Sequence, residues 1–240
     1  FVKNAPIAEV RALLTSQGDV CYGELRRQAA RVAGFLRERG LKPGERVLLV
    51  AEASPFWVYA YLGIALAGGV SVPLPTLSEA QDCRDIIERT EPRFAFIQGQ
   101  LLRRLGEGLA SGPTVIVDTL PKKLPAAIQP IPFDAVQTSA PLELPGHSAA
   151  DGELAVIMFT SGSTARPRGV MVSHGNIRSN TRDIIASLGL TADDRIMAVL
   201  PFFYCFGTSL LHTHLKAGGS LVIDTRFLFP DKVLARMIET

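Results

Sequence analysis

Short apolar runs alternate with helical patterns along most of the chain. Apolar residues at helical spacing predict a helix over 22–39 that stops at Gly40, and a short strand follows at 46–51. Further elements continue this rhythm: helices at 54–67, 78–90, 101–109, 176–188, 208–216 and 230–240, and strands at 70–73, 94–98, 114–118, 154–159, 196–200 and 221–224. Such alternation predicts an α/β fold of mainly parallel, doubly wound sheets with helices on both faces.

A proline-rich stretch interrupts the alternation. Six of the sixteen prolines fall within 119–150, where apolar runs are few. We interpret this stretch as a connection without a packed element of its own. The chain then divides into a first sheet unit over 1–118 and a second over 151–240, which together make two packed sheet units.

Composition narrows the function classes. Apolar residues make up 47% and charged residues 20% of the chain, which is typical of a globular protein. The net charge of +2 gives no electrostatic reason to expect a nucleic-acid partner. The cysteines, Cys21, Cys83 and Cys205, are odd in number and far apart, which favours a reducing compartment over a disulfide framework or a zinc site. Without a signal-peptide pattern at the start, we expect a cytoplasmic protein.

One uncharged segment, 53–78, has the length of a membrane span. Its second half contains two glycines and two prolines, and Ser54 with Pro55 forms a good helix start. The segment therefore predicts a buried helix followed by a buried strand, and we expect no membrane span.

The chemistry is concentrated in 154–176. A buried strand ends near Phe159, and hydroxyl-bearing residues, a glycine and two arginines follow at once. Backbone amides of such a turn form a concave nest for anions, to which hydroxyls and guanidinium groups add donors. The spacing fits neither a Walker loop nor a Rossmann glycine motif. From composition alone, a polyphosphate cradle and an unspecialised Ser/Thr/Gly surface loop remain equal alternatives.

The order of residues from Thr160 to Val170 resembles the phosphate-loop signature of the AMP-forming acyl-CoA synthetases, the adenylate-forming superfamily. Only Ala165, in place of glycine, and Arg168, in place of lysine, depart from it. The segments 41–47 and 67–73 are similar to early sheet elements of the same superfamily.

This resemblance implies the N-terminal part of an adenylation domain, incomplete within 1–240. The implied enzyme activates a carboxylic acid, fatty acyl or another apolar acid, with ATP and Mg²⁺ as an acyl-adenylate. It then transfers the acyl group to the thiol of CoA or of a carrier protein's phosphopantetheine. The implied phosphate-binding residues are Thr160, Ser161, Gly162, Ser163, Thr164 and Arg168.

Motifs that the superfamily uses for adenine, ribose and a C-terminal lysine do not occur in this chain, so we expect these 240 residues alone to be inactive. The alternatives are a non-catalytic nucleotide-binding module, which the changes at Ala165 and Arg168 favour, and a structural α/β domain.

A second candidate segment, Pro201 to Gly207, holds four aromatic residues after a predicted strand. Core packing explains them as well as a binding role does. The resemblance implies a gate over the acid and ATP, formed by Phe203, Tyr204 and Gly207, with Tyr204 where histidine is common. The four histidines lack ligand spacing, so we expect no metal bound by protein side chains.

Overall fold

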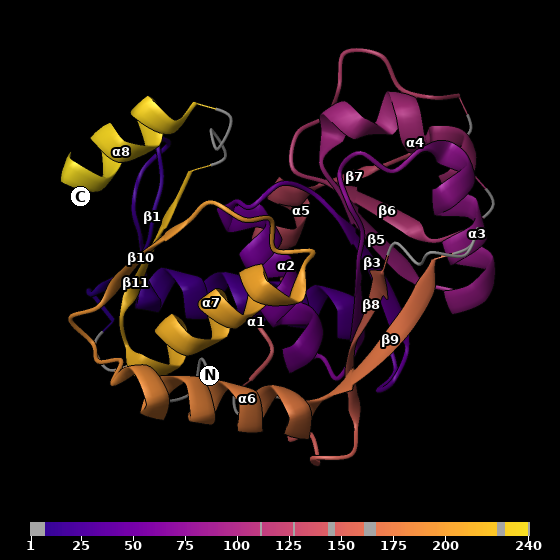
Figure 1. The fold of residues 1–240 in the computed structure, drawn as a ribbon. Helices are drawn as coiled ribbons and strands as arrows, with labels where there is room; N and C mark the ends of the chain where they lie inside the picture. The colour runs from indigo at the N-terminus through magenta and orange to yellow at the C-terminus, as the bar shows by residue number, and fades with distance from the viewer. Residues whose placement is uncertain are drawn as a thin grey trace.

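The strands of the computed structural model form two sheets (Figure 1), and the model describes residues 8–110, 112–126, 128–143, 147–160, 167–224 and 229–239. The larger sheet has the order β7 (Ile131–Pro132), β6 (Thr114–Val117), β5 (Phe94–Ile97), β3 (Arg46–Val50), β4 (Val70–Pro73), β8 (Leu154–Thr160) and β9 (Arg168–Ser173). Its strands are parallel except for β9, which is antiparallel to β8. The smaller sheet has the order β10 (Arg195–Ala198), β11 (Ser220–Ile223), β1 (Arg11–Leu14) and β2 (Val20–Cys21).

Helices cover both faces of the larger sheet, which confirms the predicted α/β class. Their bounds are α1 (Tyr22–Glu38), α2 (Pro55–Leu66), α3 (Ala80–Thr90), the 3-10 turn η2 (Gly99–Leu101), α4 (Leu102–Leu109), α5 (Phe133–Gln137), α6 (His174–Leu188), α7 (Cys205–Ala217) and α8 (Pro230–Glu239). Strand β3 shows how the faces divide. Val47 and Leu49 join the core with α1 and α2, whereas Leu48 and Val50 join the core with α3 and α4. This alternation follows from the two-residue period of a strand.

Helix α2 is the uncharged segment that has the length of a membrane span. Ser54 Oγ accepts a hydrogen bond from the backbone N–H of Trp57 at 3.3 Å, and Pro55 occupies the first helical position. The Trp57 side chain is fully buried and its ring stacks on Tyr61, 4.8 Å between centroids. The predicted buried helix followed by a strand, β4, is confirmed. Within the part of the chain that the structure describes, no helix is long and apolar enough to cross a membrane.

The two sheets do not correspond to the two sheet units predicted from the sequence, 1–118 and 151–240. Strand β8, from the second half of the chain, pairs with β4, and β1, from the first half, pairs with β11 through Leu13 and Leu221. The expected units 1–118 and 151–240 therefore exchange strands. Strands β1 and β2 have four and two residues, too short for a clear periodic signal.

The proline-rich connection also differs from the expectation. It contributes β7 to the edge of the larger sheet and α5 to the core. Phe133 is buried, with its ring edge-on to Phe56 at 5.1 Å between centroids. The prediction that 119–150 contains no packed element is thus wrong, because two apolar side chains of a five-residue helix, Phe133 and Val136, suffice to bury it.

Candidate active site

The predicted phosphate loop connects the two strands of the β8–β9 hairpin at the edge of the larger sheet (Figure 1). Thr160 and Arg168 are the register pair next to the loop, and both are exposed. Four other predicted site residues lie outside the described residues: Ser161, Gly162, Ser163 and Thr164. The hairpin therefore places the two described members of the predicted set opposite each other, at the end of the strands where the loop begins and ends.

The donors at this end suit a polyphosphate. The Arg168 guanidinium offers several N–H donors in a planar fork that matches phosphate oxygens, and the Thr160 hydroxyl adds another. Both side chains are exposed rather than committed to the core. Among the described residues, no group of three or more His, Cys, Asp or Glu side chains could hold a metal ion.

Sequence reasoning missed Arg89, which contacts both arms of the hairpin from the last turn of α3. Its Nη1 donates to the carbonyl oxygen of Pro167 at 2.8 Å, and its guanidinium lies over the Phe159 ring. Helix α3 carries no motif of the candidate site, so the residue has no local signal.

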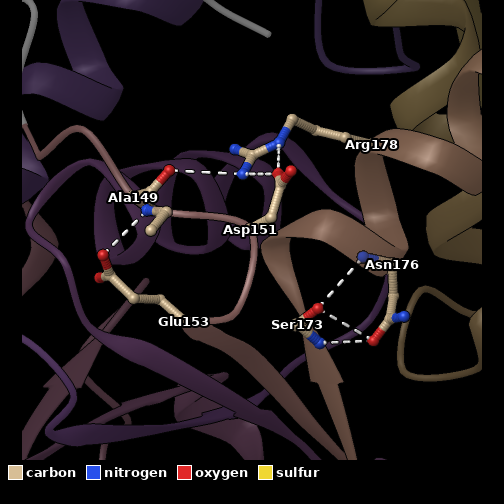
Figure 2. Close-up of polar contacts among 7 residues, drawn as sticks. Ala149, Asp151, Glu153, Ser173, Asn176 and Arg178 are labelled. Atoms are coloured by element: carbon tan, nitrogen blue, oxygen red, sulfur yellow. Dashed lines mark hydrogen bonds and ion pairs between the residues drawn. The ribbon is translucent and has the colours of Figure 1, made fainter.

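The opposite end of the hairpin is fixed by a capping box at the start of α6 (Figure 2). Ser173 Oγ accepts from the Asn176 backbone N–H at 3.1 Å, while Asn176 Oδ1 accepts from the Ser173 backbone N–H at 3.0 Å. Next to it, Arg178 Nε donates to Asp151 at 2.8 Å. Ser173 and Asn176 therefore have a structural role, since their capping box orients the hairpin relative to α6.

Two titratable groups near the capping box of α6 have shifted pKa values. Glu153 accepts from the Ala150 backbone N–H at 2.8 Å and from His147 at 2.6 Å, and these hydrogen bonds lower its pKa. Burial lowers the pKa of His174, whose backbone N–H donates to the Glu153 carbonyl at 2.9 Å. His174 thus packs at the helix start, far along β9 from the loop.

The aromatic segment before α7 divides between core and surface. The Phe202 side chain is buried against Trp57, 5.2 Å between ring centroids. Tyr204 is 54% exposed, and its ring lies 4.4 Å from that of Phe203. Core packing therefore accounts for Phe202 but leaves Tyr204 available to a ligand.

Gly207 is buried under this segment. A Cβ on Gly207 would lie 2.3 Å from the carbonyl oxygen of Pro201, so the backbone turn around the aromatic segment requires a glycine. No hydrogen bond, ion pair or ring contact joins Tyr204 to Thr160 or Arg168 among the described residues.

A cavity of about 1020 Å³ lies between α2, α6 and α7, on the side of the capping box. His212 lines it and is hydrogen-bonded through Nε2 to the Tyr61 hydroxyl at 2.9 Å. Burial lowers the pKa of His212 to about 3, so its ring is neutral at physiological pH. The lining of the cavity includes Ala155, near the start of β8, and His174, which directly follows β9.

The fold and the loop-bearing hairpin define an adenylate-forming type of protein. The family model described as AMP-binding enzyme matches residues 3–240, so the chain belongs to that family.

Similar proteins and solved structures support this family assignment. The chain is 31% identical over 239 residues to the 3-hydroxybenzoate–CoA ligase of an Aromatoleum species, covering 97% of this chain and 44% of that protein. Its structure is similar to that of a benzoate CoA ligase from Burkholderia xenovorans, with a TM-score of 0.85 and 25% identity, covering 99% of this chain and 46% of the other. ATP-bound MatB from Rhodopseudomonas palustris is similar at a TM-score of 0.84 and 27% identity, with 98% and 46% covered. The chain thus spans less than half the length of these relatives.

Proposed function

We propose that the full-length parent protein is an AMP-forming acid–thiol ligase. In the first step, an oxygen of the substrate carboxylate bonds to the α-phosphorus of ATP. The bond between the α- and β-phosphates breaks, and pyrophosphate leaves. In the second step, the thiol sulfur of CoA or of a carrier protein's phosphopantetheine bonds to the acyl carbon, and AMP leaves with the former carboxylate oxygen.

The β8–β9 hairpin is the observation that carries this proposal. At the loop end of the hairpin, Thr160 and Arg168 form a register pair that flanks the loop residues. In the proposal, these two and the loop residues Ser161, Gly162, Ser163 and Thr164 hold the β- and γ-phosphates. Charge accumulates on these phosphates as pyrophosphate departs, and donors fixed in advance stabilise that charge without reorganising. In the proposal, Mg²⁺ accompanies ATP as the counter-ion of its phosphates.

The acid is proposed to be apolar or aromatic. The exposed ring of Tyr204 adjoins the half-buried ring of Phe203 beside the start of α7, and Gly207 allows the backbone turn there. Aromatic rings suit an apolar acyl or aryl group. Two similar proteins are named for benzoate and 3-hydroxybenzoate, which favours an aryl carboxylate over a fatty acid.

A second candidate function is a nucleotide-binding module without ligase activity. It is favoured by Ala165 and Arg168, which stand where the superfamily has glycine and lysine. If position 165 needs positive φ, a Cβ there costs on the order of 1 kcal/mol, and arginine is a wider, planar group than lysine. Such a module would bind ATP without releasing pyrophosphate.

Pyrophosphate exchange into ATP tests the proposal in the full-length parent protein. Benzoate, 3-hydroxybenzoate and decanoate would be compared, each against a reaction without acid. We expect acid-dependent exchange, fastest with an aryl acid. ATP binding without exchange for any acid would favour the module, and a lack of ATP binding would overturn both candidate functions.

A further inference from the structure

Arg89 joins the two arms of the phosphate-loop hairpin. Its Nη1 donates to the carbonyl oxygen of Pro167, which directly precedes β9, at 2.8 Å. The guanidinium carbon also lies 5.1 Å from the ring centroid of Phe159, which directly precedes Thr160. One side chain therefore contacts Phe159, near the end of β8, and Pro167, the first described residue after the loop.

The Phe159 ring is itself held in place by the sheet. Its register partner is Gly169, where an added Cβ would lie 3.3 Å from the ring and 3.0 Å from Ile157. The ring also packs against the core between the larger sheet and α3 and α4. Arg89 therefore lies over a ring with a fixed position, and the planar guanidinium suits such a face because it is weakly hydrated.

Helix α3 is a firm base for this contact. Cys83 and Ile86 are buried, and Arg89 lies in the last turn, where a cation also interacts favourably with the helix dipole. The hairpin is less well supported from its other side, because β9 is the edge strand and exposes Val170 and Met171. The contacts of Arg89 thus support the hairpin at the edge of the sheet, where α3 lies beside it (Figure 1).

We propose that Arg89 is a positioning residue for the phosphate loop. The pairing of β8 with β9 sets the separation of Thr160 and Arg168. Arg89 holds this end of the hairpin against α3, and so sets how both donors face the polyphosphate. The catalytic consequence of this inference rests on the proposed function, whereas the contacts of Arg89 with Pro167 and Phe159 do not depend on a ligand.

The test compares three variants of the full-length parent protein. Arg89→Ala removes both contacts, and Arg89→Lys keeps a cation and a donor for the Pro167 carbonyl. Arg84→Ala removes an exposed arginine from the same helix as a matched control. The readouts are the KM for ATP and the rate of pyrophosphate exchange, the melting temperature, and amide hydrogen exchange of peptides covering 154–173.

We expect Arg89→Ala to lower kcat/KM for ATP by about tenfold to a hundredfold, because small misplacements of a binding group have effects of that size. Its melting temperature should match that of Arg84→Ala, since the contact is at the surface. Arg89→Lys should recover part of the loss. Faster amide exchange of the hairpin is expected in Arg89→Ala and not in Arg84→Ala.

The outcomes separate the two proposals. Absence of pyrophosphate exchange in the unaltered protein overturns the proposed function, and amide exchange of the hairpin then decides the role of Arg89 alone. Active protein in which Arg89→Ala and Arg84→Ala behave alike in kinetics and amide exchange overturns the positioning role while leaving the ligase in place.

Discussion

Thr160 and Arg168 face each other as register partners at the loop end of the β8–β9 hairpin. Antiparallel pairing fixes their separation through the backbone rather than through the loop between them. The separation of these two residues is therefore set by the sheet, and a change in either side chain should alter phosphate binding without unfolding the hairpin.

Replacing Arg168 tests this separation of binding from folding. Arg168→Ala should reduce pyrophosphate exchange by about a hundredfold, the usual effect of removing one fixed donor, with little change in melting temperature because the side chain is exposed. Arg168→Lys keeps the charge and should recover much of the rate. Arg182→Ala, an exposed arginine on α6, is the control. Exchange in Arg168→Ala equal to that of the control would remove Arg168 from the site.

The sequence predicted those elements whose boundaries carry strong local signals. Strand β4 was predicted with its observed bounds, because Gly69 precedes it and its last residue, Pro73, cannot continue a central strand. Helix α2 was predicted from Ser54 and Pro55 at its start. In both cases the stop or start depends on the backbone chemistry of residues within the element or next to it.

Features that depend on distant partners were not predictable in this way. Strand β1 pairs with β11, about two hundred positions later in the chain, and neither its length nor its pattern reveals this. Arg89 contacts Pro167 across 78 positions. The phosphate loop could be predicted because its signal is local in the sequence, whereas the contact between Arg89 and Pro167 is formed only by the fold.

Tyr204 offers a test of the proposed acid site. Tyr204→Ala should raise the KM for the aryl acid about tenfold, as expected for the loss of one aromatic contact surface, while the KM for ATP stays within twofold. Tyr204→Phe keeps the ring and should resemble the unaltered protein. Steady-state kinetics with each substrate varied in turn make the measurement. Equal changes in both KM values would argue against a specific contact with the acid.

Gly207 provides a stability test for the same segment. In Gly207→Ala the new Cβ would lie 2.3 Å from the Pro201 carbonyl oxygen, so the backbone before α7 must move. Such overpacking typically costs about 1–3 kcal/mol of unfolding free energy. Gly152→Ala is the matched control, because a Cβ there meets nothing within 4 Å, and its effect should stay within about 0.5 kcal/mol. Urea denaturation of the two variants compares them directly, and equal stabilities would show that the turn tolerates a side chain.

His212 should make the folded state sensitive to mild acid. Burial lowers its pKa in the folded chain to about 3, from an ordinary value of 6.5. Between these values the unfolded chain binds a proton that the folded chain does not. The contribution of neutral His212 is therefore fully present above pH 6.5 and is lost as the pH falls below it. The free energy of unfolding should decrease by up to about 1.4 kcal/mol per pH unit from this group.

A non-titrating substitution isolates this contribution. His212→Gln should be less stable at pH 7.5, because it disturbs the 2.9 Å hydrogen bond to Tyr61, but should lose about 1 kcal/mol less than the unaltered protein between pH 6.5 and 5.5. Tyr61→Phe is the control, since it removes the hydrogen bond and leaves the imidazole to titrate, so its pH dependence should persist. Burial also lowers the pKa values of His174 and His214, and their contribution is common to all three proteins. Parallel curves of unfolding free energy against pH for His212→Gln and the unaltered protein would exclude His212 as the source.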